Sequence, residues 1–100
     1  MKEVILSADS ESTVYSVPDA VADDLRRYCI EFCDSWLHNS PDAEKYRRGG
    51  CVCYTEADFI AYLNQYVFPQ EKSVKVKNLG WIGQRSELPA EYAGCPYFNF

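Results

Sequence analysis

The chain has 100 residues, of which 47% are hydrophobic, 15% aromatic and 25% charged, and its formal net charge is −5. This length allows one domain, residues 1–100, with enough apolar side chains for a core, and the composition excludes a disordered polar chain. The negative charge disfavours nucleic acid or an anionic membrane surface as a partner, and no apolar run approaches the ~20 residues that a membrane span needs.

The first predicted element is an N-terminal β-hairpin. The runs VILSA (4–8) and TVYSV (13–17) are rich in strand-forming residues, and they flank the polar sequence DSES (9–12). This pattern predicts two antiparallel strands joined by a four-residue loop. Pro18 ends the second strand because it has no backbone N–H to donate to the sheet.

A long amphipathic helix is predicted over residues 18–38. With a period of 3.6 residues, its apolar side chains fall on one face, which comprises Val21, Leu25, Tyr28, Cys29, Phe32 and Trp36. Acidic residues gather near its start, where the helix dipole favours negative charge.

A short second helix is predicted over 41–48. Ser40 can cap it, Pro41 suits its first position, and the basic residues Lys45, Arg47 and Arg48 suit its last turn. Gly49 and its neighbour then stop the helix, and CVCY (51–54) follows as a short strand or an extended linker.

A third helix is predicted to begin after Thr55. Asp58 lies three residues after Thr55, which is the spacing of a capping box. The apolar stripe of this helix comprises Phe59, Ile60, Leu63, Tyr66 and Val67. Pro69 closes the helix.

The C-terminal third is predicted to be mostly extended. In SVKVK (73–77) Val74 and Val76 alternate with Lys75 and Lys77, which predicts a half-buried strand whose lysines suit a sheet edge. The last residues, LPAEYAGCPYFNF, hold too many prolines for a helix and too many aromatics for a free tail, so we expect them to lie across the core. The fold class is therefore α+β: a hairpin, two amphipathic helices and a short helix, packed on a mainly antiparallel sheet of three or four strands.

The cysteines are the first candidates for chemistry. Cys29 and Cys33 are one helical turn apart and Cys51 and Cys53 are two residues apart, so four thiolates could in principle hold zinc. The C-x-C spacing is a poor chelate, however, and Cys29 lies inside the apolar stripe, where cysteine is commonly a packing residue. We therefore predict no metal site.

The remaining residues provide no recognisable catalytic group. His38 is the only histidine and lies at the expected end of the first helix, where it can meet free carbonyls. Its helical position turns it away from Cys33. Glu56 and Asp58 are helix-start acids by position, and the glycines lack the spacing of a phosphate-binding loop. The prediction is a non-enzymatic protein without a cofactor.

Aromatic residues are the least ordinary feature, because tyrosine and tryptophan are enriched in protein interfaces. The predicted contact residues for a protein partner, or for a second copy of the chain, are Tyr62, Tyr66, Trp81, Tyr92, Tyr97 and Phe98. The function expected is therefore a protein–protein interaction module. The five cysteines, an odd number, and the absence of a signal-like start point to the cytoplasm.

Two alternatives stay open. One is an acidic inhibitor of a nucleic-acid-binding protein, because residues 1–44 hold ten acids and three bases whereas residues 45–100 hold five acids and seven bases. Its acids would stand in for phosphates, and the candidates are Asp19, Asp23, Asp24, Glu31 and Asp34. The other is a zinc or thiol protein that uses its cysteines.

Overall fold

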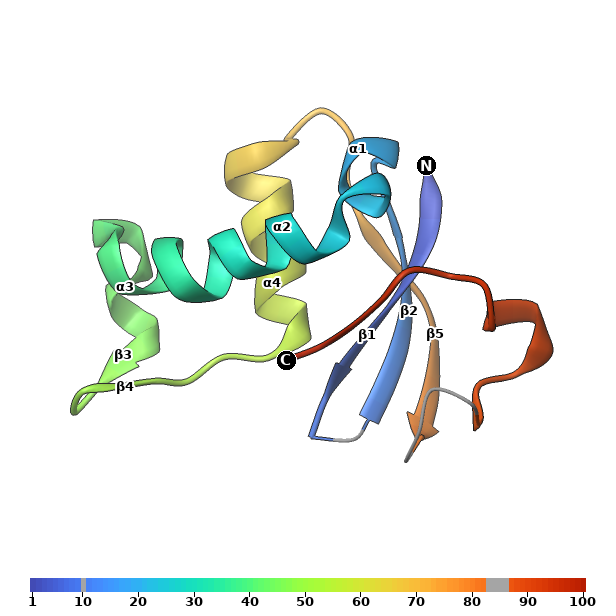
Figure 1. Cartoon of the computed structure of the whole chain (residues 1–100). Coiled ribbons are helices and arrows are strands. Elements are labelled where there is room, and N and C mark those ends of the chain that lie inside the picture. The colour runs from blue at the N-terminus through green and yellow to red at the C-terminus, as the bar shows by residue number, and fades with distance from the viewer. Residues whose placement is uncertain (10, 83–86) are drawn as a thin grey trace.

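The fold is a four-stranded sheet with helices on one face and a short C-terminal segment on the other (Figure 1). A computed structural model describes residues 1–9, 11–82 and 87–100. The strand order is β5–β2–β1–β6, with β1 (Lys2–Ala8), β2 (Glu11–Val17), β5 (Val74–Trp81) and β6 (Tyr97–Asn99). The β1–β2 and β2–β5 pairs are antiparallel, whereas β6 joins β1 in parallel. The predicted α+β class with a mainly antiparallel sheet is confirmed.

The N-terminal hairpin is confirmed, but its strands are longer than predicted. The pairing of β1 with β2 continues to Ala8 opposite Glu11, so that Glu11 and Ser12 belong to β2 and not to the loop. Asp9 follows β1 with a φ of 53°. Aspartate is one of the few residue types that tolerate this left-handed conformation.

The first predicted helix is present with one interruption. It consists of α1 (Asp19–Asp23), α2 (Leu25–Ile30), the π-helical segment η1 (Glu31–Trp36) and α3 (Leu37–Asn39). The interruption is Asp24, whose φ of −143° and ψ of 44° are not helical. Aspartate competes for backbone hydrogen bonds inside helices and prefers their ends, so the break falls at a residue that accommodates it. The predicted apolar stripe faces the core, with Tyr28 and Trp36 partly buried and the other four members buried.

The second predicted helix is shorter than expected, and the prediction that Arg47 and Arg48 form its last turn is wrong. Residues Pro41–Tyr46 form the 3₁₀ helix η2, and Ser40 Oγ accepts a hydrogen bond from the Asp42 amide at 3.2 Å. The two arginines that follow form β3 (Arg47–Arg48), which pairs with β4 (Cys51–Val52). The glycines between them have φ values of 54° and 83°. They form a hairpin turn that needs two positive φ angles, and glycine takes these without strain.

The third predicted helix is confirmed as α4 (Glu56–Tyr62) continued by the π-helical segment η3 (Leu63–Val67). The capping box is present, because Asp58 Oδ2 accepts a hydrogen bond from the Thr55 amide at 2.8 Å. The helical run ends before Pro69, as expected from its missing N–H.

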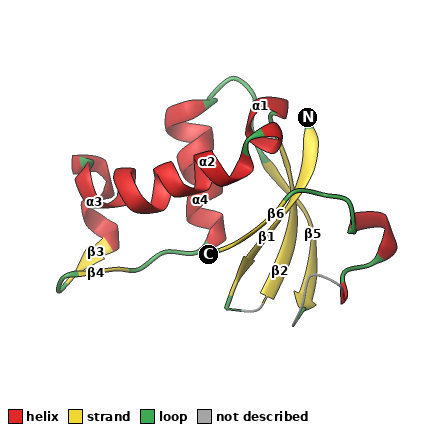
Figure 2. Ribbon diagram, in the orientation of Figure 1, coloured by secondary structure: helices red, strands yellow, loops and turns green. Residues whose placement is uncertain are grey.

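The two faces of the sheet bury separate clusters of apolar side chains. On the helical face, β1 and β2 contribute Val4, Leu6, Tyr15 and Val17, which pack against α1, α2 and α4. On the other face, Ile5 and Val14 pack with Leu88 and Tyr92 from the segment that contains the 3₁₀ helix η5 (Ala90–Tyr92). Figure 2 shows the helices on one side of the strands and this segment on the other. The C-terminal residues therefore lie across the sheet as predicted, although Ala90–Tyr92 form a 3₁₀ helix and only Tyr97–Asn99 form a strand.

The predicted strand at 73–77 lies at the edge of the sheet, as its lysines suggest, but it is not half-buried. Residues 74–78 are all exposed. The prediction fails because neither apolar cluster of the sheet extends to these residues, and of β5 only Leu79 packs against one of the clusters.

Candidate functional site

The outer edge of the main sheet, formed by β5, gathers exposed apolar side chains. Among the described residues, five large hydrophobic side chains are exposed, and three of them lie on β5. Trp81 is 81% exposed, Val74 54% and Val76 45%. Single exposed hydrophobic residues are ordinary, but a nearly free tryptophan on the same edge strand as two valines is not. We call these three residues, together with Lys75 and Lys77, the β5 edge.

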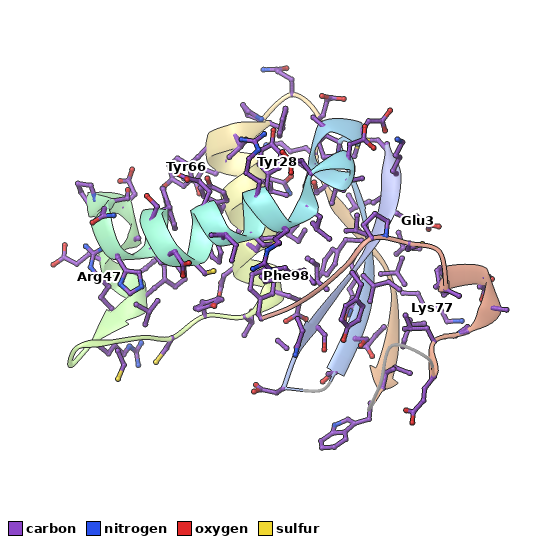
Figure 3. All side chains as sticks on the ribbon, in the orientation of Figure 1. Glu3, Tyr28, Arg47, Tyr66, Lys77 and Phe98 are labelled. Atoms are coloured by element: carbon purple, nitrogen blue, oxygen red, sulfur yellow. The ribbon has the colours of Figure 1, made fainter. Side chains whose placement is uncertain are left out.

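The first register shift separates the two lysines of the β5 edge. Lys75 pairs with Tyr15, and Lys77 pairs with Val14. Consecutive residues of β2 point to opposite faces of the sheet, and paired residues share a face. Lys75 therefore lies on the helical face and Lys77 on the other face, where Figure 3 labels it beside the C-terminal segment. A regular strand would have placed both lysines on one face.

The second register shift lies at the end of β5 that carries Trp81. It falls where Gly80, with a φ of 76°, pairs with Ser12. The Asn78 side chain accepts a hydrogen bond from the Gly80 amide at 2.6 Å and donates one to Glu11 Oε1 at 2.5 Å. These bonds tie the strand end to β2, so Trp81 projects from a held position in the sheet.

The six predicted contact residues do not form one surface. Tyr62 and Tyr92 are buried, one in each apolar cluster, and Tyr97 and Phe98 are partly buried. Tyr66 is 42% exposed and lies in η3, where its ring centroid is 5.2 Å from that of Trp36. Only Trp81 of the six belongs to the β5 edge. Val74 and Val76 complete that edge, and the alternating pattern had assigned them to a half-buried face.

The cysteines are distributed over several environments. Cys29 is buried, and burial raises the pKa of its thiol strongly. Cys33 is partly buried, and burial followed by the charge of Asp34 raises its pKa. Cys51 and Cys53 are exposed near the β3–β4 hairpin. Across residues 1–9, 11–82 and 87–100, no group of three or more histidine, cysteine or acidic side chains is arranged to hold a metal ion.

The free carbonyl groups at the end of α3 accept hydrogen bonds from an arginine that we predicted to lie in the second helix. Arg47 Nη1 donates hydrogen bonds to the carbonyl of Leu37 at 2.9 Å and to that of Ser40 at 3.0 Å. His38, which we expected to meet such carbonyls, is exposed. Arg47 lies eight residues after the end of α3 at Asn39, so its sequence position gave no signal of this contact.

A hollow of about 530 Å³ lies where the β3–β4 hairpin meets the start of α4. Its lining residues are Lys45, Tyr46, Arg48, Cys53, Tyr54, Thr55 and Asp58. It contains one cysteine and not the histidine. Asp58 is engaged by the Thr55 amide, and Lys45 Nζ lies 5.1 Å from the Tyr46 ring centroid.

Basic groups partner several of the acidic residues near α1 and α2. The N-terminal ammonium lies 3.0 Å from Asp19, Lys2 Nζ lies 2.7 Å from Asp23, and Arg27 pairs with Asp24. These contacts lower the pKa of Asp19, through its hydrogen bond with the ammonium group, and raise that of Lys2. Glu31 and Asp34 are exposed on η1. Cations therefore interrupt the acidic surface at three of its five candidate residues.

Comparison with known proteins identifies no relative: no family model, curated protein or solved structure matches the chain. In the part of the chain that the structure describes, no helix combines the length and the apolar character that crossing a bilayer takes.

Proposed function

We propose that the protein is a non-enzymatic interaction module that docks a protein partner on the β5 edge. The observation that carries this proposal is the 81% exposure of Trp81 on β5, an edge strand that pairs only with β2 among the described residues. Tryptophan is strongly enriched among the residues that contribute most to binding, because its large ring loses much water contact in an interface.

Two further observations support this proposal. The hydrogen bonds of Asn78 with Gly80 and Glu11 hold the end of β5 in place. The backbone at Trp81 therefore loses little conformational entropy when the ring binds a partner. Val74 and Val76 extend the apolar contact along the same strand. We place the module in the cytoplasm, in keeping with the odd number of cysteines.

The proposal is tested by replacing the exposed apolar side chains. The double variant Val76→Ser with Trp81→Ser removes apolar contact area from the β5 edge, whereas Tyr66→Ser removes an exposed ring from η3 and serves as the matched control. Tagged forms of the three proteins are incubated with lysate of the source cells, and captured proteins are quantified by mass spectrometry. Circular dichroism confirms that each variant is folded.

The expected result is a defined set of proteins that the wild type and the Tyr66→Ser variant capture and the double variant loses. Equal capture by all three proteins, or no specific capture by the wild type, would contradict docking through the β5 edge. The acidic-inhibitor alternative gains no support, because three of its five acids are already paired with cations.

A further inference from the structure

We propose that the β5 edge receives an extended acidic segment of its partner, whose neighbouring carboxylates reach Lys75 on one face of the sheet and Lys77 on the other. This inference rests on the proposed function and adds to it the chemistry of the partner.

The β5 edge carries positive charge on a chain that is negative overall. From Val74 to Trp81 the strand carries two lysines and no acidic residue, although the whole chain has a net charge of −5. Lys75 and Lys77 are both exposed, and neither takes part in an ion pair among the described residues. By contrast, Lys2 and Arg27 on the helical side are both paired. The strand itself therefore carries only positive charge, which an acidic ligand complements, and the nearby carboxylate of Glu11 on β2 accepts a hydrogen bond from Asn78.

The placement of the lysines selects an extended ligand. Lys75 and Lys77 lie on opposite faces of the sheet because they pair with consecutive residues of β2. In an extended segment alongside β5, consecutive side chains also point to opposite faces. Two adjacent acidic residues can therefore reach both lysines at once, while a helix lying against the sheet would contact one face.

The same features disfavour a second copy of the chain. Edge-to-edge pairing of two copies would bring lysines close to lysines, which destabilises a strand pair. Register shifts and lysines are also devices by which edge strands avoid pairing with copies of themselves. The two lysines of β5 attract the carboxylates of an acidic strand, whereas they repel the lysines of an identical strand.

Nucleic acid is disfavoured on two grounds. The net charge of −5 repels a polyphosphate. Binding of single strands also uses several stacked aromatic side chains in a basic groove, whereas the β5 edge offers valines and one tryptophan.

The experiment is a titration of the ¹⁵N-labelled protein, followed by NMR, which detects weak binding. Three synthetic peptides of valine and threonine, matched in length to the eight residues of β5, serve as probes. One carries two adjacent central glutamates, one carries two glutamates separated by a single residue, and one carries two adjacent lysines. A thymidine oligonucleotide is the fourth probe. The protein variants are Lys75→Glu with Lys77→Glu and, as a control of equal charge change, Lys45→Glu with Arg48→Glu.

The inference predicts that the adjacent-glutamate peptide shifts the amide resonances of β5 and binds more tightly than the separated-glutamate peptide. Reversal of the two β5 lysines should weaken this binding by roughly tenfold, as the loss of two exposed ion pairs predicts, and the control variant should bind like the wild type. Binding that is equal for the glutamate and lysine peptides, or equal in both charge-reversed variants, would overturn the inference. Shifts of β5 resonances by the oligonucleotide alone would also overturn it.

The outcomes separate this inference from the proposed function. If the Val76→Ser, Trp81→Ser variant loses its cellular partners but no acidic peptide binds β5, docking stands and the acidic chemistry is wrong. If acidic peptides bind β5 but partner capture does not depend on the apolar side chains, the proposed function is wrong.

Discussion

Replacing Phe32 with alanine should reduce the free energy of unfolding by about 5 kcal/mol, near the top of the range for buried phenylalanine. The Phe32 side chain is fully buried, and its ring centroid lies between 5.2 and 6.3 Å from those of five other rings. These rings belong to Trp36, Tyr54, Phe59, Tyr62 and Phe100. Because Phe59 and Tyr62 are held on α4, and Tyr54 and Phe100 on two other segments, the cavity cannot collapse without moving several elements. A domain of this size is stable by only about 5–15 kcal/mol, so the variant should be close to unfolding.

Urea denaturation followed by far-UV circular dichroism measures this loss. Phe32→Leu keeps most of the volume and should cost about 1–2 kcal/mol, which keeps the test informative if the alanine variant does not fold. With a denaturant slope of about 1.5 kcal/mol/M, the midpoint should fall by roughly 1 M for leucine and roughly 3 M for alanine. Tyr66→Ala, which removes a 42% exposed ring, is the control and should cost about 1 kcal/mol. A loss below about 2 kcal/mol for Phe32→Ala would refute the idea of a rigid ring cluster.

Three further predictions concern thiols, tyrosines and a helix cap. In a thiol-reagent assay on the native protein, Cys51 should react rapidly because it is exposed, and Cys29 only after unfolding because it is fully buried; rapid reaction of both would contradict the packing. Burial raises the pKa of Tyr15 and Tyr54 to about 12 from the ordinary 10. Both hydroxyls stay protonated longer in the folded state than in the unfolded one, so stability should be full below about pH 10 and fall towards pH 12. Urea denaturation at several pH values measures the fall, and a flat profile over this range would count against the buried environment. Asp58→Ala removes the acceptor of the N-cap amide and should cost about 1 kcal/mol in the same assay, whereas no change would mean that the capping bond contributes nothing.

The elements that the sequence predicts well are those whose periodicity reflects local chemistry. The stripe of Leu25, Cys29 and Phe32 is buried as expected, because residues spaced at a 3.6-residue period share one helical face and an apolar face packs against the core. The capping box at Thr55 and Asp58 is also confirmed, since it depends on residues three apart.

What the sequence does not reveal depends on pairing between distant segments. Val74 and Val76 are exposed because the apolar clusters on the two faces of the sheet do not extend to this part of β5, and no local pattern encodes how far those clusters reach. Arg47 donates hydrogen bonds to the carbonyls at a helix end from a hairpin strand, although the cluster of Lys45, Arg47 and Arg48 suggested the last turn of a helix. Residue type predicts Trp81 as a contact residue, but it predicts five other aromatic residues equally well. Only the burial of each side chain in the folded structure distinguishes Trp81 from them.

The parallel pairing of β6 with β1 has a consequence for how fast the protein folds. It joins Ile5 to Tyr97, and the β2–β5 pair joins Ser16 to Val74, so most of the sheet depends on contacts between residues far apart in the chain. Closing such large loops costs entropy before any strand contact repays it. We expect refolding on the millisecond-to-second timescale typical of non-local topologies, with the N-terminal hairpin and the helices forming earlier than the complete sheet.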